Sequence, residues 1–194
     1  MNFSEKIMRI FLIFAWFLGF CMNPLFSAIE DQNSIQKIDK RKDCMNYSVQ
    51  EKETIKIIGI SIRTTNKEGQ SVKDISAFWQ KFFQENIVSK IPNKKGTDIF
   101  CLYTNYEGDF MAPYTVIIGC EVETFDQIPE GMISKIIPKA QYAVFTTDST
   151  QQVSSKWNQI WQTKLDRTYL TDFEVYKNAL SITNPVVDIC VGIR

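Results

Sequence analysis

The stretch Asp98-Ile-Phe-Cys-Leu-Tyr-Thr-Asn105 has a counterpart later in the chain, Asp172-Phe-Glu-Val-Tyr-Lys-Asn178. In this alignment Cys101 falls on Glu174, and a tyrosine follows two residues later in both copies. Both stretches are rich in aromatic and β-branched residues, which strands favour. A second strand-like segment follows each of them. These matches indicate that the chain contains a duplicated unit, and the predicted fold follows from that duplication.

The first copy extends from this stretch in both directions. Its predicted order is strand, helix, strand and strand, at residues 54–65, 72–91, 98–107 and 114–123. The helix is predicted because apolar residues recur at helical spacing, namely Ile75, Phe78, Trp79, Phe82, Phe83 and Ile87. Ser71 and Asp74 resemble a capping box at its start.

The second copy repeats this order. We predict a long strand within residues 131–148, a helix at 149–165, and strands at 173–178 and 186–193. Pro138 marks an edge or a bulge in the long strand, because proline cannot donate to a strand ladder. The predicted fold class is α+β, with tandem β-α-β-β repeats related by a pseudo-two-fold axis. Antiparallel sheets packed by two helices would surround a central ligand cleft.

The last strands of the two copies also align, with Cys120 on Cys190. If each strand pair closes symmetrically, Cys101 lies across from Cys120, and Glu174 lies across from Cys190. Cross-strand neighbours are close enough to permit a Cys101–Cys120 disulfide, and Cys190 would be a thiol in the cleft. The alternative is that these cysteines, and Cys44, are free thiols.

The composition excludes several kinds of site. The 194 residues include no histidine, so Ser-His-Asp and Cys-His catalysis and His-ligated metal sites are absent. No CxxC motif is present, and we expect neither a metal nor a cofactor. Lys and Arg together number 22, as do Asp and Glu, and this balance argues against nucleic-acid binding.

Residues 1–28 form a segment distinct from the rest. Lys6 and Arg9 precede an uncharged apolar run from Ile10 to Met22, and small residues follow at Ser27 and Ala28. The run has the length of a signal-peptide core and is shorter than the roughly 20 residues that span a bilayer. These features predict a cleaved secretory signal peptide.

Two alternatives remain for the same segment. Residues 10–28 approach spanning length if Asn23 and Pro24 are tolerated, which would make them an uncleaved membrane anchor. A lipoprotein signal ending at Cys21 is disfavoured by the bulky Phe20 before it. Every alternative predicts an exported protein, either periplasmic or secreted, or anchored in the membrane and facing away from the cytoplasm.

The region after this segment is polar and then becomes strand-like. Residues 29–52 show no sustained hydrophobic period and are interpreted as a flexible linker. Residues 53–194 are predicted to form one folded domain.

Three segments of this domain resemble a known family. They are Gln141-Tyr-Ala-Val-Phe145, Trp157-Asn-Gln-Ile-Trp161 and Asp172-Phe-Glu-Val-Tyr176. Together they resemble the second half of the GyrI-like effector-binding domain, and the likeness covers residues 53–194. This domain occurs fused to bacterial transcription activators of AraC type, and alone in integron-associated effector-binding proteins. Here it would be stand-alone, with an export signal that the cytoplasmic regulators lack.

The resemblance implies a pocket between the two repeats. It also implies a buried glutamate in that pocket, facing aromatic residues that receive hydrophobic, often cationic, ligands. That glutamate corresponds to Glu174. The residues expected to bind the ligand are Glu174, Tyr176, Trp157, Tyr142, Tyr103 and Trp161. Tyr106 and Tyr114 are expected near the mouth.

The strand around Glu174 gives a physical reason for such a site. Alternation places Asp172, Glu174 and Tyr176 on one face of the strand. A carboxylate buried there without a partner would have a raised pKa, and a cation would relieve the cost of burial. The alternative is that Glu174 faces solvent or pairs with Lys177.

Three functions are consistent with these residues. The first is an effector-binding protein that captures a small amphipathic or cationic molecule, with Glu174 as buried counter-charge. The second is a small-molecule hydrolase that uses Glu174 as general base, with Tyr176 or Tyr142 orienting the substrate. The third is a protein-interaction module, although an exported chain would not meet gyrase.

Overall fold

The computed structural model describes residues 47–194. The predicted signal peptide or anchor, most of the predicted linker, and Cys44 lie outside the described residues. Among residues 47–194, no helix combines the length and the apolar character needed to cross a bilayer.

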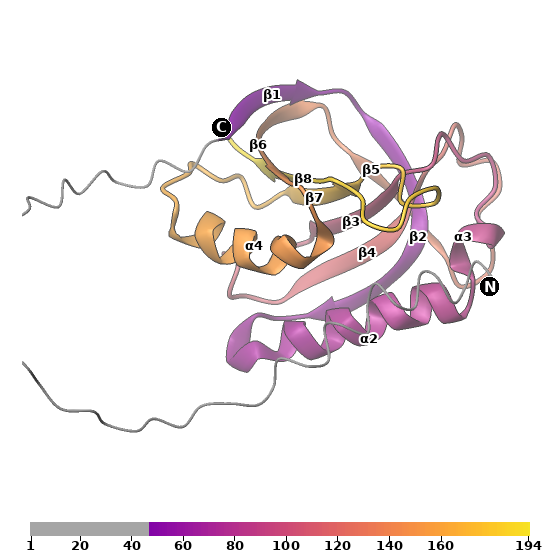
Figure 1. The fold of residues 1–194 in the computed structure, drawn as a ribbon, viewed down its shortest axis with the longest axis horizontal. Coiled ribbons are helices and arrows are strands. Elements are labelled where there is room, and N and C mark those ends of the chain that lie inside the picture. The colour runs from indigo at the N-terminus through magenta and orange to yellow at the C-terminus, as the bar shows by residue number, and fades with distance from the viewer. Residues whose placement is uncertain (1–46) are drawn as a thin grey trace, which may run out of the picture.

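Eight strands form one antiparallel sheet, in the order β1-β6-β8-β7-β3-β4-β2-β5 (Figure 1). In chain order the strands are β1 (Ser48–Lys52), β2 (Ile55–Thr64), β3 (Ile99–Thr104), β4 (Tyr114–Glu121), β5 (Ile133–Ile137), β6 (Ala140–Thr147), β7 (Thr171–Tyr176) and β8 (Val187–Gly192). The predicted strands are present, but the predicted long strand is two strands that separate at Pro138. Residues 48–52, expected to be linker, form β1 on the edge of β6.

The strand order is that of a duplicated unit. The first copy consists of β2, α2, β3 and β4, and the second of β6, α4, β7 and β8, with β3 and β7 adjacent at the centre. Cys101 and Glu174, which the sequence repeat aligns with each other, pair directly across β3 and β7. A position that pairs with its own repeat equivalent lies beside the pseudo-two-fold axis. The predicted α+β fold class is thus confirmed.

The sheet curls into a half-barrel because a short link joins two distant strands. β5 and β6 are six places apart in the strand order, which would be about 29 Å in a flat sheet. Only Pro138 and Lys139 connect them, and three Cα steps reach at most about 11 Å. Gly59 and Gly119 face each other on β2 and β4, where a Cβ on either would lie within 2.2 Å of a backbone oxygen on the opposite strand. The glycine pair permits this close approach.

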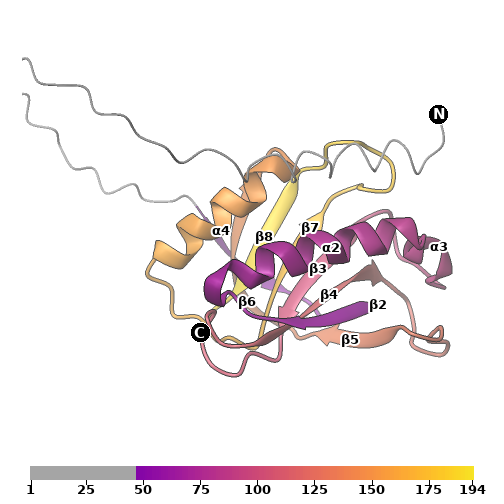
Figure 2. The same cartoon turned by 90° about the horizontal axis from the view of Figure 1, so that it is seen from below.

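Two helices cover one face of the sheet, α2 (Gln70–Gln84) and α4 (Val153–Gln162) (Figures 1 and 2). The single helix predicted to reach Ile91 is interrupted at Asn86, which adopts φ 49° and ψ 45°, and a short α3 (Ile87–Lys90) follows. Asparagine tolerates this left-handed conformation and ends helices there. The predicted capping box is wrong, because α2 begins after Gly69 without a side-chain cap. Asp74 instead accepts a hydrogen bond from Thr64 at 2.6 Å.

The sheet separates two apolar clusters. The cluster on the helix-bearing face includes Phe78, Trp79 and Phe82 from α2 and Val153, Trp157 and Ile160 from α4. The opposite face holds Ile57, Phe100, Leu102, Ile117, Ile137, Tyr142, Val144, Phe173 and Cys190 inside the curl. The strands β2, β3, β4, β6, β7 and β8 contribute residues to both clusters, because side chains alternate between the two faces of a strand.

The predicted strand register of the cysteines is wrong, by two residues for Cys101 with Cys120 and by one residue for Glu174 with Cys190. Cys101 pairs with Ile118 and Glu174 with Ile189, so Cys120 corresponds to Val191 in the second repeat and not to Cys190. A one-residue slip moves a side chain to the other face of a sheet. Cys190 therefore lies inside the curl, away from Glu174, and Cys101, Cys120 and Cys190 are free thiols.

Candidate functional site

A cavity of about 230 Å³ lies on the helix-bearing face, between α2 and α4 and above the central strands. Most of its lining is aromatic or apolar, with a few polar groups. The lining residues are Asn66, Ser71, Val72, Ile75, Ser76, Trp79, Gln80, Tyr103, Tyr106, Phe110, Tyr114, Thr150, Val153, Ser154, Trp157, Trp161, Arg167, Glu174 and Tyr176. This composition is typical of a small-molecule site.

Glu174 is the central polar group of the cavity. It lies in the middle of β7, and only 1% of its surface is exposed. Its Oε1 accepts hydrogen bonds from the Tyr103 hydroxyl at 2.8 Å and from the Trp157 indole N–H, and its Oε2 accepts one from the Tyr176 hydroxyl at 2.7 Å. All three donors are neutral. The carboxylate is oriented by its neighbours, but its charge is not balanced by them.

Burial dominates the ionisation of this cluster. Desolvation raises the pKa of Glu174, and the hydrogen bonds from Trp157, Tyr176 and Tyr103 oppose that rise. Burial, with the nearby Glu174 charge adding to it, also raises the pKa of the Tyr176 hydroxyl and of the Cys101 thiol. The tyrosines are therefore hydrogen-bond donors here, and no thiolate forms beside them.

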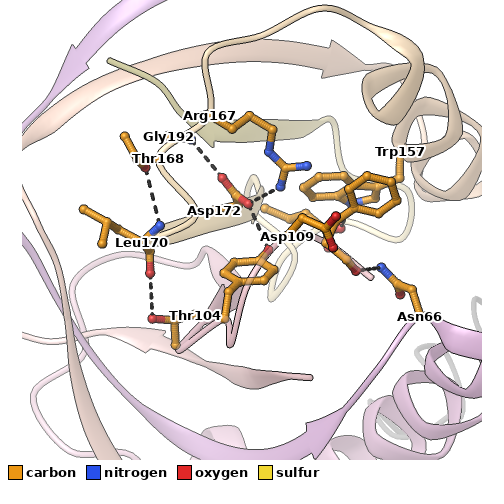
Figure 3. A network of polar contacts seen from close by, with 12 residues as sticks. Asn66, Thr104, Asp109, Trp157, Arg167, Thr168, Leu170, Asp172 and Gly192 are labelled. Carbon is orange, nitrogen blue, oxygen red and sulfur yellow. Dashed lines mark hydrogen bonds and ion pairs between the residues drawn. The ribbon is translucent and has the colours of Figure 1, made fainter. Parts of the chain in front are cut away.

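A second buried carboxylate lies two residues earlier on the same face of β7. Asp172 is fully buried, and it forms an ion pair with Arg167 (Figure 3). Its Oδ2 also accepts a hydrogen bond from the Tyr106 hydroxyl at 2.9 Å, and its Oδ1 accepts one from the backbone N–H of Gly192 at 2.9 Å. The charge of Asp172 is thus balanced inside the protein.

The loop between β3 and β4 covers one side of the cavity. Phe110 in this loop stacks on Trp161 of α4, with ring centroids 5.4 Å apart and planes 9° from parallel. Asn66 donates a hydrogen bond to the Phe110 carbonyl at 2.7 Å and accepts one from the Tyr114 hydroxyl at 2.7 Å. Val72, at the start of α2, lines the cavity yet is 65% exposed. The cavity therefore opens to solvent beside α2.

The structure brings most of the predicted site residues together. Five of the six line the cavity, namely Tyr103, Trp157, Trp161, Glu174 and Tyr176. The expectation that Tyr142 forms a cavity wall is wrong. Tyr142 points into the curl, packs on Phe173 and donates a hydrogen bond to the Pro138 carbonyl at 3.0 Å. The alternative pairing of Glu174 with Lys177 is also wrong, since Lys177 pairs with Asp188.

Several cavity residues were not predicted from the sequence as ligand contacts. Trp79 was placed on an apolar helix stripe, and it lines the cavity as Trp157 does from the other helix. Asp172 was placed on the face of Glu174, which is correct, but its partner Arg167 lies in an irregular segment before β7. No local pattern indicates that an arginine in such a segment folds back onto the strand.

The donor set of the site favours organic ligands. In the described part of the chain, no three Cys, Asp or Glu side chains gather as metal ligands would. What the cavity offers is aromatic surface, one uncompensated carboxylate and one arginine. Such a set can bind a hydrophobic molecule that carries positive charge.

A curled antiparallel sheet with two helices flanking an aromatic cavity defines the GyrI-like class of effector-binding domains. The chain belongs to the integron-associated effector binding protein family, whose model matches residues 48–193. A relative in Bacillus subtilis strain 168, YobU, has the name of a proposed transcriptional regulator. It is 31% identical over 144 residues, which cover 70% of this chain and 90% of YobU.

Solved structures show the same fold. One is VCH_CASS2, an integron cassette protein from the mobile metagenome of Vibrio cholerae, which is 27% identical in sequence with a TM-score of 0.62. The match covers 76% of this chain and 95% of the VCH_CASS2 chain. A second solved structure is that of SAV2435 bound to tetraphenylphosphonium, whose sequence is 18% identical and whose TM-score is 0.61. The match covers 77% of this chain and 94% of the SAV2435 chain. At that identity the second likeness concerns the fold alone.

Proposed function

We propose that the cavity binds a small hydrophobic cation and that Glu174 is its buried counter-charge. The observation that carries this proposal is the isolation of the Glu174 charge. Within residues 47–194, its hydrogen-bond partners are neutral and no Lys or Arg forms an ion pair with it. A buried carboxylate without a cation is costly, and a cationic ligand would remove that cost.

The surrounding rings would add to the attraction. Tyr103 and Trp157 pack edge to face, with centroids 5.3 Å apart, and both donate to Glu174. Donation to an anion makes each ring richer in electrons, which strengthens its attraction for a cation. Each cation–π contact contributes roughly 0.5–2 kcal/mol. The apolar remainder of the ligand would pack on Trp79 and Trp161.

The comparisons support the choice of ligand class. The fold neighbour SAV2435 was solved with tetraphenylphosphonium, which is a hydrophobic monocation. We therefore choose this cation as the first probe. The biological role that we propose is that of a sensor component or scavenger of such compounds.

Export through residues 1–28 is a separate part of the proposal. It rests on the apolar run of 13 residues that follows Lys6 and Arg9. Cell fractionation of the full-length protein with a C-terminal tag tests it. A mature protein shortened by about 28 residues in the periplasm or medium would support cleavage, and a full-length cytoplasmic protein would contradict export.

The ligand proposal is tested by tryptophan fluorescence, since Trp157 and Trp161 line the cavity. The probes are tetraphenylphosphonium, methyltriphenylphosphonium and the neutral triphenylphosphine oxide. We expect saturable quenching by the two cations, and at least tenfold weaker cation binding in Glu174→Gln, which corresponds to about 1.4 kcal/mol. The neutral compound should bind both proteins alike.

The matched control is Glu123→Gln, which removes an exposed carboxylate outside the cavity lining. It should bind the cations as the wild type does. Equal cation affinity in Glu174→Gln and the wild type would contradict the proposal. Mass analysis of the recovered probe, extended to ester-bearing cations, separates a binder, which returns the ligand unchanged, from a hydrolase.

A further inference from the structure

We propose that Arg167 forms a second subsite in the same cavity, which takes a neutral hydrogen-bond acceptor on the ligand. The ligand class is then a hydrophobic monocation that carries a carbonyl, hydroxyl or ether oxygen. This inference rests on the proposed function of the cavity and narrows the ligand that it selects.

The guanidinium of Arg167 has unused donors. The side chain lines the cavity and the residue is only 7% exposed. A guanidinium has five N–H groups. In Arg167, Nη2 donates a hydrogen bond to the Asp172 carboxylate. Its Nε is buried and has no partner within residues 47–194. A buried donor without an acceptor costs about 1–3 kcal/mol. Within residues 47–194, Nη1 has no hydrogen bond either and is not among the fully buried atoms, so it is the donor that an acceptor on the ligand would reach from the cavity.

The guanidinium is also held in place before any ligand arrives. Asp172 anchors one end, and Asp172 is itself fixed by the Tyr106 hydroxyl and the Gly192 amide. The guanidinium carbon lies 4.5 Å from the centre of the Tyr169 ring, over its face. A donor fixed on both sides loses little entropy when it binds an acceptor.

The balance of charge selects a neutral acceptor. Arg167 and Asp172 cancel each other, so the net charge that the cavity presents is that of Glu174. A carboxylate or phosphate on the ligand would lie close to both Asp172 and Glu174 and would be repelled. A carbonyl or hydroxyl oxygen accepts the same hydrogen bond without that repulsion.

The spacing of the two subsites constrains the ligand further. Asp172 and Glu174 are two residues apart on one strand face, which is about 7 Å along the strand. Tyr103 lies beside both, because it pairs with Asp172 across the strands and donates to Glu174. A flat ring between the cationic centre and the acceptor oxygen would match this arrangement.

Calorimetric titration with two matched probes tests the subsite. One is benzyltrimethylammonium with a para-acetamido group, and the other has a para-isobutyl group of similar size without the acceptor. The proteins are the wild type, Arg167→Lys and the double variant Arg167→Met/Asp172→Asn. Lysine keeps a charge for Asp172, but its three donors lie on one nitrogen, so it does not reproduce the separate N–H groups of the planar guanidinium. The double variant leaves neither charge buried alone.

We expect the ratio of acetamido affinity to isobutyl affinity to fall at least fivefold from the wild type to either variant. An unchanged ratio in a folded variant would overturn the proposal, and so would a wild type that binds neither probe. A crystal structure of the wild type with the acetamido probe gives a result that needs no variant. The carbonyl oxygen within hydrogen-bond distance of Arg167 supports the subsite, and its placement elsewhere overturns it.

Glu174→Gln separates this proposal from the proposed function. If both hold, this variant weakens both probes equally and leaves their ratio unchanged. If Glu174→Gln changes neither affinity while Arg167→Lys still lowers the ratio, the counter-charge is wrong and the Arg167 subsite stands. The reverse pattern retains the counter-charge and removes the subsite.

Discussion

Asp172 and Glu174 are two buried carboxylates on the same face of one strand, yet their surroundings are opposite. Asp172 has an arginine, a tyrosine hydroxyl and a backbone amide as partners. Glu174 has two tyrosine hydroxyls and an indole N–H, all of them neutral. The number of hydrogen bonds is similar, and the difference lies in the charge.

Under our proposal, this difference separates a structural group, Asp172, from a ligand-binding group, Glu174. The charge of Asp172 is neutralised by Arg167, so its burial is already compensated in the folded protein. Within residues 47–194 the charge of Glu174 has no charged partner, and under our proposal a bound cation would supply one. Perturbed carboxylates in cavities are candidates for function for this reason. If the two carboxylates differ in this way, their variants should differ in stability and in cation binding.

The largest expected effect is the loss of stability in Asp172→Asn. This change leaves Arg167 buried without its counter-ion, which costs about 3–5 kcal/mol of unfolding free energy. Glu174→Gln should change that free energy by less than about 1 kcal/mol, or increase it, because it removes an unpaired buried charge. Urea denaturation of both variants measures the contrast. Equal losses of unfolding free energy in the two variants would contradict the difference in charge balance between Asp172 and Glu174.

A smaller contrast is expected from the tyrosines that donate to each carboxylate. Tyr176→Phe leaves the Oε2 of Glu174 without the donor that it has in the structure, and should cost about 1.5–3 kcal/mol. Tyr106→Phe leaves Asp172 with Arg167 and the Gly192 amide, and should cost about 1 kcal/mol. Thermal and urea unfolding measure both. A larger loss in Tyr106→Phe would reverse the comparison.

The smallest effect expected is in the pH dependence of cation binding. The pKa of Glu174 is raised in the folded protein, so its contribution to stability is fully present below its unfolded pKa and is lost as pH rises through the folded value. Cation affinity should change in the opposite sense and rise with pH, by up to tenfold per pH unit below the folded pKa.

Titration of tetraphenylphosphonium binding between pH 4 and pH 8 measures this slope. Glu174→Gln should bind with a flat profile, and Tyr176→Phe should move the midpoint to higher pH, because the Tyr176 hydrogen bond lowers the pKa of Glu174. A sloping profile in Glu174→Gln would assign the titration to another group.

Local sequence patterns were sufficient to predict the helices and strands and to predict which residues share a strand face with Glu174. Helical spacing gave α2 and α4, and strand alternation put Asp172, Glu174 and Tyr176 on one side of β7, as the structure has them. The repeat alignment of Cys101 with Glu174 also holds, since the two pair across the centre of the sheet. These features depend on neighbours in sequence, which determine them through backbone geometry.

The register between strands that are distant in the sequence could not be predicted from local sequence patterns. The alignment of Cys120 with Cys190 is wrong by one residue, and that slip placed Cys190 on the wrong face. Tyr142 was expected to form part of the cavity wall, and nothing local to β6 shows which of its faces lies inside the curl. The curl follows from the link at Pro138, which joins two strands that are distant in the sheet.

The sequence by itself determined the duplicated α+β unit, its two aromatic helices and the strand face that Asp172, Glu174 and Tyr176 share, whereas the pocket position of Glu174 was implied by the family resemblance. Periodicity encodes the helices and strand faces, because it follows from backbone geometry within each element, and the duplication shows in the repeated order of the elements. Only the tertiary structure decided that Arg167 neutralises Asp172 and leaves Glu174 alone. Charge balance inside a protein depends on which groups meet in space, and a loop arginine that folds onto a buried strand leaves no periodic trace in the chain.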